Sequence, residues 1–340
     1  MARYLVTGGA GFIGSHLVDS LMADGHAVRV LDDMSSGSAD NLPGRAELQV
    51  ADVTDPDAVG RALEGVDGCF HLAAIASVER GHKDWLRSHT VNLSGTIAVF
   101  EAACRAQRVR GQRLPVVYAS SAAVYGNPRD IPISEQTPTF PTSAYGVDKL
   151  GCDLHAAVAG RIQEMSTIGL RFFNVYGPRQ DPHSPYSGVI SIFCERISRL
   201  LPVDLHGDGG QVRDFVFVDD AVRALRRAMQ SATSAPMLQV FNVCSGIGTS
   251  ISQLGEMIAR IQGVSFTPRY TLARAGDVRV SIGDPRLARD QLNFMTRTSL
   301  EQGLRWTLES IMPRHRSDAP DKSLILTAEP PVRVQAGPAP

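Results

Sequence analysis

The sequence predicts an α/β protein with an open, doubly wound parallel sheet and a second, smaller unit of mixed α/β structure. In the first half, short apolar runs alternate with stretches of helical periodicity, which is typical of βαβ units and of a sheet covered by helices on both faces. The first of these units turns through Gly8, Gly11 and Gly14. Glycines at this spacing indicate a strand that passes through a tight turn into a helix.

The composition is that of a globular protein that binds a small molecule. The chain has 340 residues, 43% of them hydrophobic, and a formal net charge of -1, which gives no footprint for nucleic acid or for an anionic membrane. The five cysteines form no Cys-x-x-Cys pair, so neither a metal site nor a disulfide framework is expected. Because the sequence has neither a signal-peptide pattern nor a membrane-spanning apolar run, we expect a cytoplasmic protein.

The first unit has a strand at residues 4–7 and a helix at residues 15–24. Its turn can hold a pyrophosphate at the helix N-terminus, and the residues expected to do so are Gly8, Gly11, Phe12, Ile13 and Gly14. The next strand, at residues 27–31, ends in Asp32 and Asp33, where a carboxylate can bind the ribose hydroxyls of NAD and repel the 2'-phosphate of NADP. The alternative is a structural turn beside a solvated acidic pair.

Further strands are expected at residues 47–50, 68–72 and 115–120, with helices at 55–63 and 84–108 between them. Ligands of open α/β sheets bind at the carboxyl ends of the strands. The residues at those ends are Asp52, Val53, Ala73 and Ala74, which we expect beside the adenine and the nicotinamide ribose. His71 has no identifiable carboxylate partner, so a structural role is expected for it rather than a catalytic one.

Tyr145 and Lys149 stand four residues apart in a helix expected at residues 143–161. At this spacing two side chains share a face, so the ammonium can favour the ionised phenol. An exposed lysine beside a half-buried tyrosine is the alternative. The strand before this helix ends in the hydroxyls of Ser120 and Ser121, and a proline-rich loop at residues 127–142 connects the two.

Three motifs in this order resemble the extended short-chain dehydrogenase/reductase superfamily, and specifically its nucleotide-sugar epimerases. They are the Gly8 to Gly14 turn, the Ser-Ser-x-x-Val-Tyr-Gly segment ending at Gly126, and Tyr145-x-x-x-Lys149. The resemblance implies a Rossmann-type fold that binds NAD tightly. The cofactor-binding residues that it adds, beside Tyr145 and Lys149, are Ser36, Gly37, Leu72, Asn92 and Phe172.

Three segments of the second half resemble the sugar-nucleotide site of the same family. Residues 170–182 resemble its Arg-x-x-Asn-x-x-Gly segment, in which Asn174 corresponds to the residue that contacts the sugar nucleotide. Arg213 lies in the segment whose arginine grips the diphosphate, and Arg274 in a second phosphate- or ribose-binding segment. Ala275 departs from the family, since many relatives carry Pro or Glu there. Ordinary surface charges are the alternative for both arginines. Further substrate-binding residues expected here are Gln180, Gly188, Val189 and Asp277.

The resemblance also implies a reaction. Tyr145 would take the proton of a sugar hydroxyl, Ser121 would hydrogen-bond the same oxygen, and the hydride on that carbon would pass to NAD and return to the other face of a 4-keto sugar. Related 4,6-dehydratases carry Asp-Glu just before Val-Tyr-Gly, and related decarboxylases place a Glu there. This chain has Ala122 and Ala123, which favours epimerisation, although another residue could supply an acid.

The expected substrate is a UDP-sugar. In the family, the residue seven after the arginine of Arg-x-Gly-Asp gates the pocket, and a small residue admits N-acetylated sugars. Here it is Ser281, and Gly188 is small as well. We therefore expect turnover of UDP-N-acetylglucosamine and UDP-N-acetylgalactosamine, with UDP-glucose and UDP-galactose as further candidates. A loop position without a steric role is the alternative for Ser281. UDP-glucuronate 4-epimerisation and a non-catalytic NAD-binding protein are the competing functions.

The rest of the chain completes the organisation. Helices are expected at residues 189–201, 219–229, 250–261 and 300–309, and a returning strand at 239–243. Residues 1–174 with about 215–243 are assigned to the NAD-binding domain, residues 175–214 with 244–313 to the UDP-sugar domain, and 314–340 to a disordered tail. By analogy with the family, the helices at 84–108 and 143–161 form a homodimer interface, although core packing explains their apolar stripes equally well.

Overall fold

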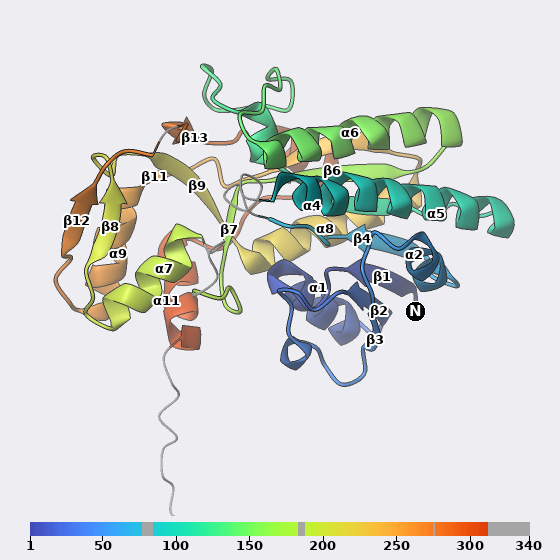
Figure 1. Ribbon diagram of the computed structural model, residues 1–340, viewed down its shortest axis with the longest axis horizontal. Helices are drawn as coiled ribbons and strands as arrows, with labels where there is room; N and C mark the ends of the chain where they lie inside the picture. Colours follow the sequence, from blue (N-terminus) through green and yellow to red (C-terminus); the bar gives the residue numbers. More distant parts are fainter. Residues whose placement is uncertain (77–83, 183–187, 275, 312–340) are drawn as a thin grey trace, which may run out of the picture.

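The computed structural model describes residues 1–76, 84–182, 188–274 and 276–311 (Figure 1). Its centre is a seven-stranded sheet in the order β10-β6-β5-β4-β1-β2-β3, in which every neighbouring pair is parallel. The Rossmann-type sheet predicted from the alternating pattern is confirmed. The strands are β1 (Arg3–Thr7), β2 (Ala27–Asp32), β3 (Glu47–Val50), β4 (Gly68–His71), β5 (Val116–Ser121), β6 (Thr167–Phe172) and β10 (Leu238–Val243).

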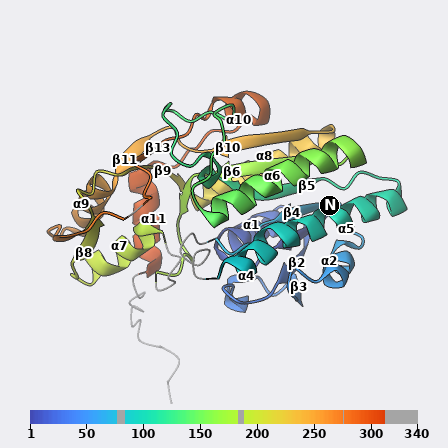
Figure 2. The ribbon, with the colours of Figure 1, turned by 45° about the horizontal axis from the view of Figure 1, so that its top comes forward.

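Helices cover both faces of this sheet, and each face has its own hydrophobic core (Figures 1 and 2). On one face lie α1 (Phe12–Ala23), α8 (Val218–Ser234) and α10 (Arg286–Leu292). On the other lie α2 (Pro56–Leu63), α4 (Trp85–His89), α5 (Gly95–Arg110) and α6 (Ala144–Gln163). Two buried layers on one sheet follow from the near-continuous apolar character of its central strands.

The helix expected over residues 84–108 is not a single α-helix. Between α4 and α5 the chain forms a π-helical segment, Thr90–Ser94. A π turn widens the helix by one residue, which the apolar periodicity of the sequence does not reveal. Asn92 lies in this segment and is fully buried, with its carboxamide bonded to both the N–H and the carbonyl of Ile75 (2.7 and 3.2 Å). The wide turn therefore holds the chain as it leaves β4.

The smaller unit is built around β9 (Val212–Phe217). This strand pairs with β7 (Asn174–Tyr176), β11 (Gly248–Ser250) and β13 (Val280–Ser281). A second, two-stranded sheet joins β8 (Val203–His206) to β12 (Pro268–Thr271). The helices α7 (Val189–Ser198), α9 (Ile251–Gln262) and α11 (Leu300–Ile311) contribute to a third hydrophobic core with these strands. This is the mixed α/β unit that the sequence predicts.

Buried Asp214 ties the segments of the smaller unit together. Its carboxylate accepts hydrogen bonds from the N–H groups of Ser245 (2.7 Å), Gly246 (2.9 Å) and Gly283 (3.2 Å). Burial raises the pKa of this carboxyl above its usual value, although the donors oppose the shift. Asp214 thus fixes the loop after β10 and the end of β13 against β9. The predicted disordered tail lies outside the described residues. Over the part of the chain that is described, no helix combines the length and the apolar character needed to cross a membrane.

Candidate active site

The turn between β1 and α1 is bare of side chains at the place where a pyrophosphate would lie. Gly8 has φ +69°, and a Cβ on it would lie 2.7 Å from the backbone nitrogen of Ala73. A residue with a side chain would therefore be strained and would also collide with the end of β4. Gly11 is the N-cap of α1 and offers no side-chain cap, so the first turn of the helix keeps its dipole for a ligand. Phe12, Ile13 and Gly14 form that turn. These features fit a dinucleotide.

Asp32 ends β2 beside this turn. Only 7% of the residue is exposed, and its two carboxylate oxygens accept hydrogen bonds from the N–H groups of Ala10 and Met34, each at 2.9 Å. Burial raises the pKa of Asp32 above its usual value. Asp33 is exposed, and its Oδ1 accepts bonds from the N–H and the hydroxyl of Ser35. Of the acidic pair, Asp32 is the member placed against the glycine turn.

The segment after β2 folds back over the same turn. A Cβ on Gly37 would lie 2.8 Å from the Cβ of Ala10, and Ser38 donates its N–H to the carbonyl of Ala10 (3.1 Å). Ser36 is exposed beside this contact. Ser36 and Gly37, which the family resemblance assigns to the cofactor, are thus neighbours of the glycine turn.

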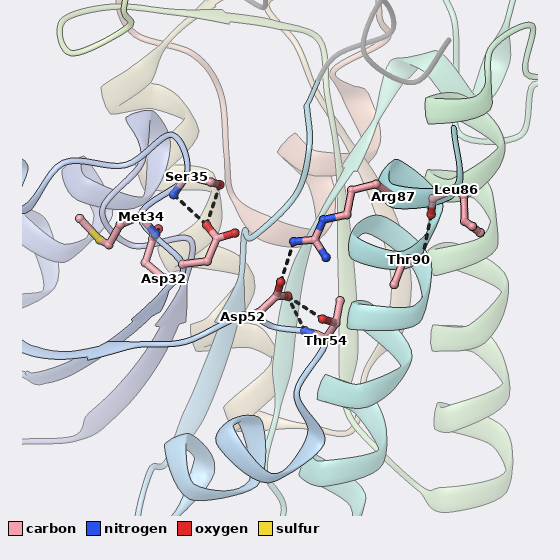
Figure 3. A network of polar contacts seen from close by, with 9 residues as sticks. Asp32, Met34, Ser35, Asp52, Thr54, Leu86, Arg87 and Thr90 are labelled. Atoms are coloured by element: carbon pink, nitrogen blue, oxygen red, sulfur yellow. Dashed lines mark hydrogen bonds and ion pairs between the residues drawn. The ribbon is translucent and has the colours of Figure 1, made fainter. Parts of the chain in front are cut away.

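Asp52 belongs to a network that the sequence analysis missed (Figure 3). Its Oδ2 accepts a bond from Nη2 of Arg87 (2.6 Å), and its Oδ1 accepts bonds from the N–H and the hydroxyl of Thr54, both at 2.8 Å. Partial burial acts to raise the pKa of Asp52, but the bonds from Arg87 and Thr54 outweigh it and hold the pKa below its usual value. Arg87 lies on α4 and also faces the carboxylates of Asp33 and Asp84. It therefore joins α4 to the loop after β3 and adds a positive charge near the end of β2.

The end of β4 is held by buried hydroxyls. The N–H groups of Leu72 and Ala73 both donate to Thr7 Oγ1 at 3.2 Å. His71 is buried, with its two ring nitrogens within hydrogen-bond distance of the hydroxyls of Thr7 (2.7 Å) and Thr96 (2.9 Å). Burial, aided by the charge of Lys149, lowers the pKa of His71 to about 3. A neutral imidazole between two hydroxyls is the structural histidine that the sequence favours. Ala74 and Val53, at the same edge of the sheet, follow β4 and β3.

Tyr145 and Lys149 lie on the first turns of α6. Ser143 caps this helix by accepting the N–H of Gly146 on its hydroxyl (3.1 Å). The ammonium of Lys149 lies 5.9 Å from the centre of the Tyr145 ring and donates to the carbonyl of Ala119 on β5 (2.9 Å). Lys149 is 3% exposed, so its charge is held in place beside the phenol. The shared face that the spacing predicts is present.

Ser121 lies close to the start of the same helix. It ends β5 and caps a 3-10 turn, Ala122–Tyr125, by accepting the N–H of Ala123 on its hydroxyl (3.1 Å). A Cβ on Gly146 would lie only 2.6 Å from the carbonyl oxygen of Ala123, so α6 can reach this turn only with glycine there. Tyr145, one residue earlier, is half-buried at this junction. Phe172 faces Ser121 across the β5–β6 ladder.

A buried ion pair between Arg171 and Asp153 holds α6 against the sheet. No role was predicted for either side chain from the sequence. Arg171 on β6 donates from Nε to Asp153 on α6 (3.0 Å), one helical turn beyond Lys149. The Tyr118 hydroxyl donates to the same carboxylate (3.1 Å), and Arg171 also donates to the Tyr125 hydroxyl (2.9 Å). Burial raises the pKa of Asp153, while the Arg171 charge opposes the shift. These contacts lock α6 onto β5 and β6.

Three of the residues predicted to bind substrate gather in the smaller unit. Arg213 on β9 donates from Nη2 to Asp277 Oδ1 (2.6 Å) and from Nη1 to the carbonyl of Val278 (2.6 Å). Ser281 on β13 is the parallel partner of Arg213 and is half-buried. Burial lowers the pKa of Arg213, although Asp277 opposes the shift. Arg274 is exposed, and its carbonyl accepts the N–H of Asp277 (3.3 Å).

The remaining predicted substrate residues follow β6. Asn174 is exposed at the start of β7, and Gly188 is the N-cap of α7, which begins at Val189. A Cβ on Gly188 would lie 3.2 Å from the amide nitrogen of Gln180, so these two residues are in contact. The Oε1 atom of Gln180 is buried, and within the described residues it has no hydrogen-bond partner. The segment that joins them, residues 183–187, lies outside the described residues.

Comparisons with known proteins agree on one family. The model of the "NAD dependent epimerase/dehydratase family" matches residues 4–244. The chain is 40% identical over 313 residues to a UDP-glucose 4-epimerase of Mycolicibacterium smegmatis, covering 90% of this chain and 97% of that protein. Among solved structures, UDP-glucose 4-epimerase from Thermotoga maritima with UDP-glucose has a TM-score of 0.85 at 37% identity, covering 91% of this chain and 98% of that one. UDP-N-acetylglucosamine 4-epimerase from Methanobrevibacter ruminantium M1, in complex with UDP-N-acetylmuramic acid, has a TM-score of 0.84 at 32% identity, covering 91% and 97%.

Proposed function

The chain belongs to the NAD dependent epimerase/dehydratase family, within the extended short-chain dehydrogenase/reductases, and we propose that it is a UDP-sugar 4-epimerase. The observation that carries this proposal is the junction of β5 and α6. There Tyr145, the enclosed Lys149 and Ser121 come together beside the strand ends at which NAD binds in this fold. The curated relative from M. smegmatis, a UDP-glucose 4-epimerase by name, supports the same reading.

NAD is the cofactor of this family, and when bound it supplies a hydride acceptor that later returns the hydride. The residues that we propose to hold it come from the strand ends of the large sheet. The glycine turn takes the pyrophosphate, Asp32 the adenine ribose, and Asp52 with Val53 the adenine. Further proposed cofactor contacts are Asp33, Ser36, Gly37, Leu72, Ala73, Ala74, Phe172 and the two residues of α6, Tyr145 and Lys149. The carboxamide of Asn92, by contrast, holds Ile75, so a role in shaping the site fits it best.

In the proposed reaction, Tyr145 is the general base. Its phenolate oxygen takes the proton of the 4-hydroxyl of the sugar, and Ser121 hydrogen-bonds the same oxygen. Lys149 keeps a positive charge near the phenol because the carbonyl of Ala119 holds its ammonium. After the transient 4-keto sugar has turned over in the site, Tyr145 returns the proton to the oxygen of the product. The sugar leaves with inverted configuration at that carbon and without net oxidation.

The turn after Ser121 favours epimerisation over elimination of water. Removing water from a sugar needs an acid and a base besides the tyrosine. The two residues at the start of this turn are Ala122 and Ala123, which carry no titratable group. The phenol of Tyr145 and the hydroxyl of Ser121 suit the transfer of the 4-hydroxyl proton, and the turn adds no further acid or base to them.

We propose that the sugar site admits N-acetylated hexoses. Ser281, the family's gate position, stands next to Arg213, which we assign to the diphosphate together with Arg274 and Asp277. A small side chain there leaves room for an N-acetyl group. The relative from M. ruminantium, by name a UDP-N-acetylglucosamine 4-epimerase, supports this breadth. The remaining proposed sugar contacts are Asn174, Gln180, Gly188 and Val189.

Product analysis tests the function directly. The purified protein with its NAD is incubated separately with UDP-glucose, UDP-N-acetylglucosamine and UDP-glucuronate, and the products are separated by chromatography. We expect interconversion of both hexose pairs, UDP-glucose with UDP-galactose and their N-acetylated forms. Conversion of UDP-glucuronate alone would make the protein a UDP-glucuronate 4-epimerase. No conversion of any sugar, with binding retained, would make it a non-catalytic NAD- and nucleotide-sugar-binding protein.

We further propose a cytoplasmic homodimer with two lobes, an NAD-binding lobe and a UDP-sugar lobe. The five cysteines are free and buried, which suits a reducing compartment. On α6 the side chains of Val147, Leu154, Val158 and Ile162 are between 52% and 69% exposed, although all four are apolar. This stripe runs along a helix that lies beside α5 (Figure 2), and an exposed apolar stripe on paired helices is typical of a dimer interface.

A further inference from the structure

A cavity of about 610 Å³ opens between α1 and α8, away from the proposed NAD site. Tyr4 lies near the amino end of β1 and His26 just before β2, whereas the glycine turn and Asp32 lie at the carboxyl ends of these strands. The cavity and the candidate active site are therefore at opposite edges of the sheet. Its volume is in the range of cavities that hold small ligands. Its walls are formed by Leu21 of α1, by three aromatic rings, by four arginines and by apolar and polar residues of α8.

The arginines reach the cavity from two directions. Arg223, Arg226 and Arg227 share one face of α8, and Arg297 comes from the segment between α10 and α11. The Asp220 carboxylate places Arg297, because it is buried and accepts the N–H of Arg297 (3.0 Å) and that of Thr298 (3.0 Å). Two elements far apart in the chain are thus fastened together so that their guanidinium groups converge.

Carboxylates balance only part of this positive charge. Asp220 is paired with Arg223, and Asp24 with Arg226, which also donates to Ser20 Oγ (2.9 Å) and so bridges α8 to α1. Arg227 donates to the neutral Gln230 (3.3 Å). Burial lowers the pKa of Arg223; Asp220 opposes the shift, and the charges of Arg297 and Arg227 add to it. An anion between these guanidinium groups would relieve the repulsion between them.

An aromatic wall stands beside the arginines. Tyr4 makes edge-to-face contacts with His26 (5.2 Å between ring centres) and with buried Phe70 (5.5 Å). Tyr4 and His26 are only half-buried, so part of each ring is accessible from the cavity. The charge of Asp67 acts on Tyr4, and this carboxylate is paired with Arg110 and accepts the N–H of Arg3. Flat rings beside guanidinium groups form a surface for a base and a phosphate together.

We propose that this cavity is a second ligand site, for a nucleoside phosphate. Arg227 and Arg297, with Arg223 behind them, bind the phosphate groups, because the guanidinium fork matches the spacing of phosphate oxygens. The base lies against Tyr4 and His26. The site is independent of the active site, since none of its residues belongs to the NAD or UDP-sugar positions described above.

Calorimetric titration with ADP tests the site. The protein carries its NAD, and UDP-glucose is present in excess so that the nucleotide-sugar position is filled. We expect one ADP to bind per chain. R227A/R297A should bind ADP at least about tenfold more weakly, because each substitution removes a charge-assisted hydrogen bond to phosphate. R105A/R108A is the matched control, because it removes two arginines of α5 on the other face of the sheet and should bind ADP like the wild type.

Two further titrations test which parts of the nucleotide the site binds. Inorganic phosphate and adenosine are titrated separately, and both should bind more weakly than ADP. Equal affinities for phosphate and ADP would overturn the assignment of the base to Tyr4 and His26. Failure of the wild type to bind ADP, or unchanged binding by R227A/R297A, would overturn the site itself. Arg227 and Arg297 are both exposed, and thermal unfolding of the variant checks that its fold is intact; R227Q/R297Q replaces it if it is not.

Discussion

The Lys149 side chain is almost fully buried, so its ammonium group has a fixed position beside Tyr145. Its ammonium is anchored on the Ala119 carbonyl and directed along the face that carries Tyr145. A fixed cation beside a phenol stabilises the phenolate at every stage of a cycle in which the tyrosine gives and takes one proton. The same charge also disfavours protonation of His71, which lies behind it.

Replacement of Tyr145 by Phe removes the proposed base and little else. We expect epimerisation to fall by a factor on the order of 10² to 10⁴, which is the usual contribution of a general base. The midpoint of thermal unfolding should stay close to that of the wild type, since Tyr145 is only half-buried. Turnover is measured on UDP-glucose and UDP-N-acetylglucosamine, and turnover at the wild-type rate would remove Tyr145 from the mechanism.

Replacement of Ser281 by Tyr tests the gate. A ring in place of this half-buried side chain should fill the space next to Arg213 that we assign to the N-acetyl group. We expect turnover of UDP-N-acetylglucosamine to be lost while that of UDP-glucose persists. S265Y, which changes an exposed serine that follows α9 in the smaller unit, is the control. An equal loss on both sugars would contradict the gate.

His71 makes stability depend on pH. Its pKa is about 3 in the folded protein, so between that value and the ordinary value near 6.5 the unfolded chain binds more protons than the folded one. The free energy of unfolding should therefore rise with pH across this window, by at most about 1.4 kcal/mol per pH unit from this group. Acidification from pH 7 towards pH 5 should lower the midpoint of urea unfolding.

Two variants isolate this contribution. His71→Asn should flatten the dependence of the urea midpoint on pH, although it lowers stability overall by disturbing the bonds to Thr7 and Thr96. His155→Asn removes an exposed histidine of α6 and should leave the slope as it is. If H71N kept the full slope, other groups would have to account for the acid sensitivity.

At the scale of elements, close approaches decide where the reacting groups meet. The first turn of α6 touches the 3-10 turn after β5 because Gly146 has no side chain, and this contact puts Tyr145 beside the strand that Ser121 ends. The π-helical segment between α4 and α5 has a comparable role, because it directs Asn92 onto the chain that leaves β4. Both features position side chains, and neither takes part in the proposed reaction itself.

The bond between Arg87 on α4 and Asp52 in the loop after β3 is the contact between elements that lies nearest to the proposed adenine position. Arg87→Ala should free Asp52, which we place beside the adenine, from its fixed position. The pair is partly exposed, with side chains 41% and 31% accessible, so we expect NAD to bind only about two- to fivefold more weakly. Affinity is measured by fluorescence titration of protein freed of NAD.

Arg105→Ala is the matched control for this variant, because Arg105 forms an exposed ion pair with Glu101 on α5. It should bind NAD like the wild type. Unchanged affinity in R87A would mean that the Asp52 carboxylate keeps its place without the arginine.

At the scale of the molecule, the exposed stripe on α6 predicts association. We expect the protein to elute as a dimer in gel filtration with light scattering, and L154E/I162E to elute as a monomer, because two buried charges would oppose the interface. Ile247 in the smaller unit is as exposed as Ile162, at 69%, so I247E is the control and should remain dimeric. A dimeric L154E/I162E would exclude this stripe as the interface.

The spacing of residues along the chain was sufficient to predict the fold and several residues of the candidate site. The glycine turn, the acidic end of β2 and the four-residue interval between Tyr145 and Lys149 each act within one or two elements, so the sequence determined them and, with them, the Rossmann-type sheet. Alternation of apolar and helical segments determined the parallel order for the same reason. The helical stretch predicted over residues 84–108 is present, but its π turn was not predicted because such a turn changes the backbone without changing the apolar pattern.

Tertiary structure alone decided which distant side chains meet. Arg87 and Asp52 are 35 residues apart, and Arg213 and Asp277 are 64 apart, yet each pair is joined at 2.6 Å. Arg297 joins the three arginines of α8 at the proposed nucleoside phosphate site because the buried Asp220 carboxylate fastens the chain before α11 to α8. Such contacts depend on how helices and sheets pack, which no interval along the chain encodes. The sequence therefore determined the fold and the placement of Tyr145 and Lys149, the pair that we propose to be catalytic, and packing decided what surrounds them.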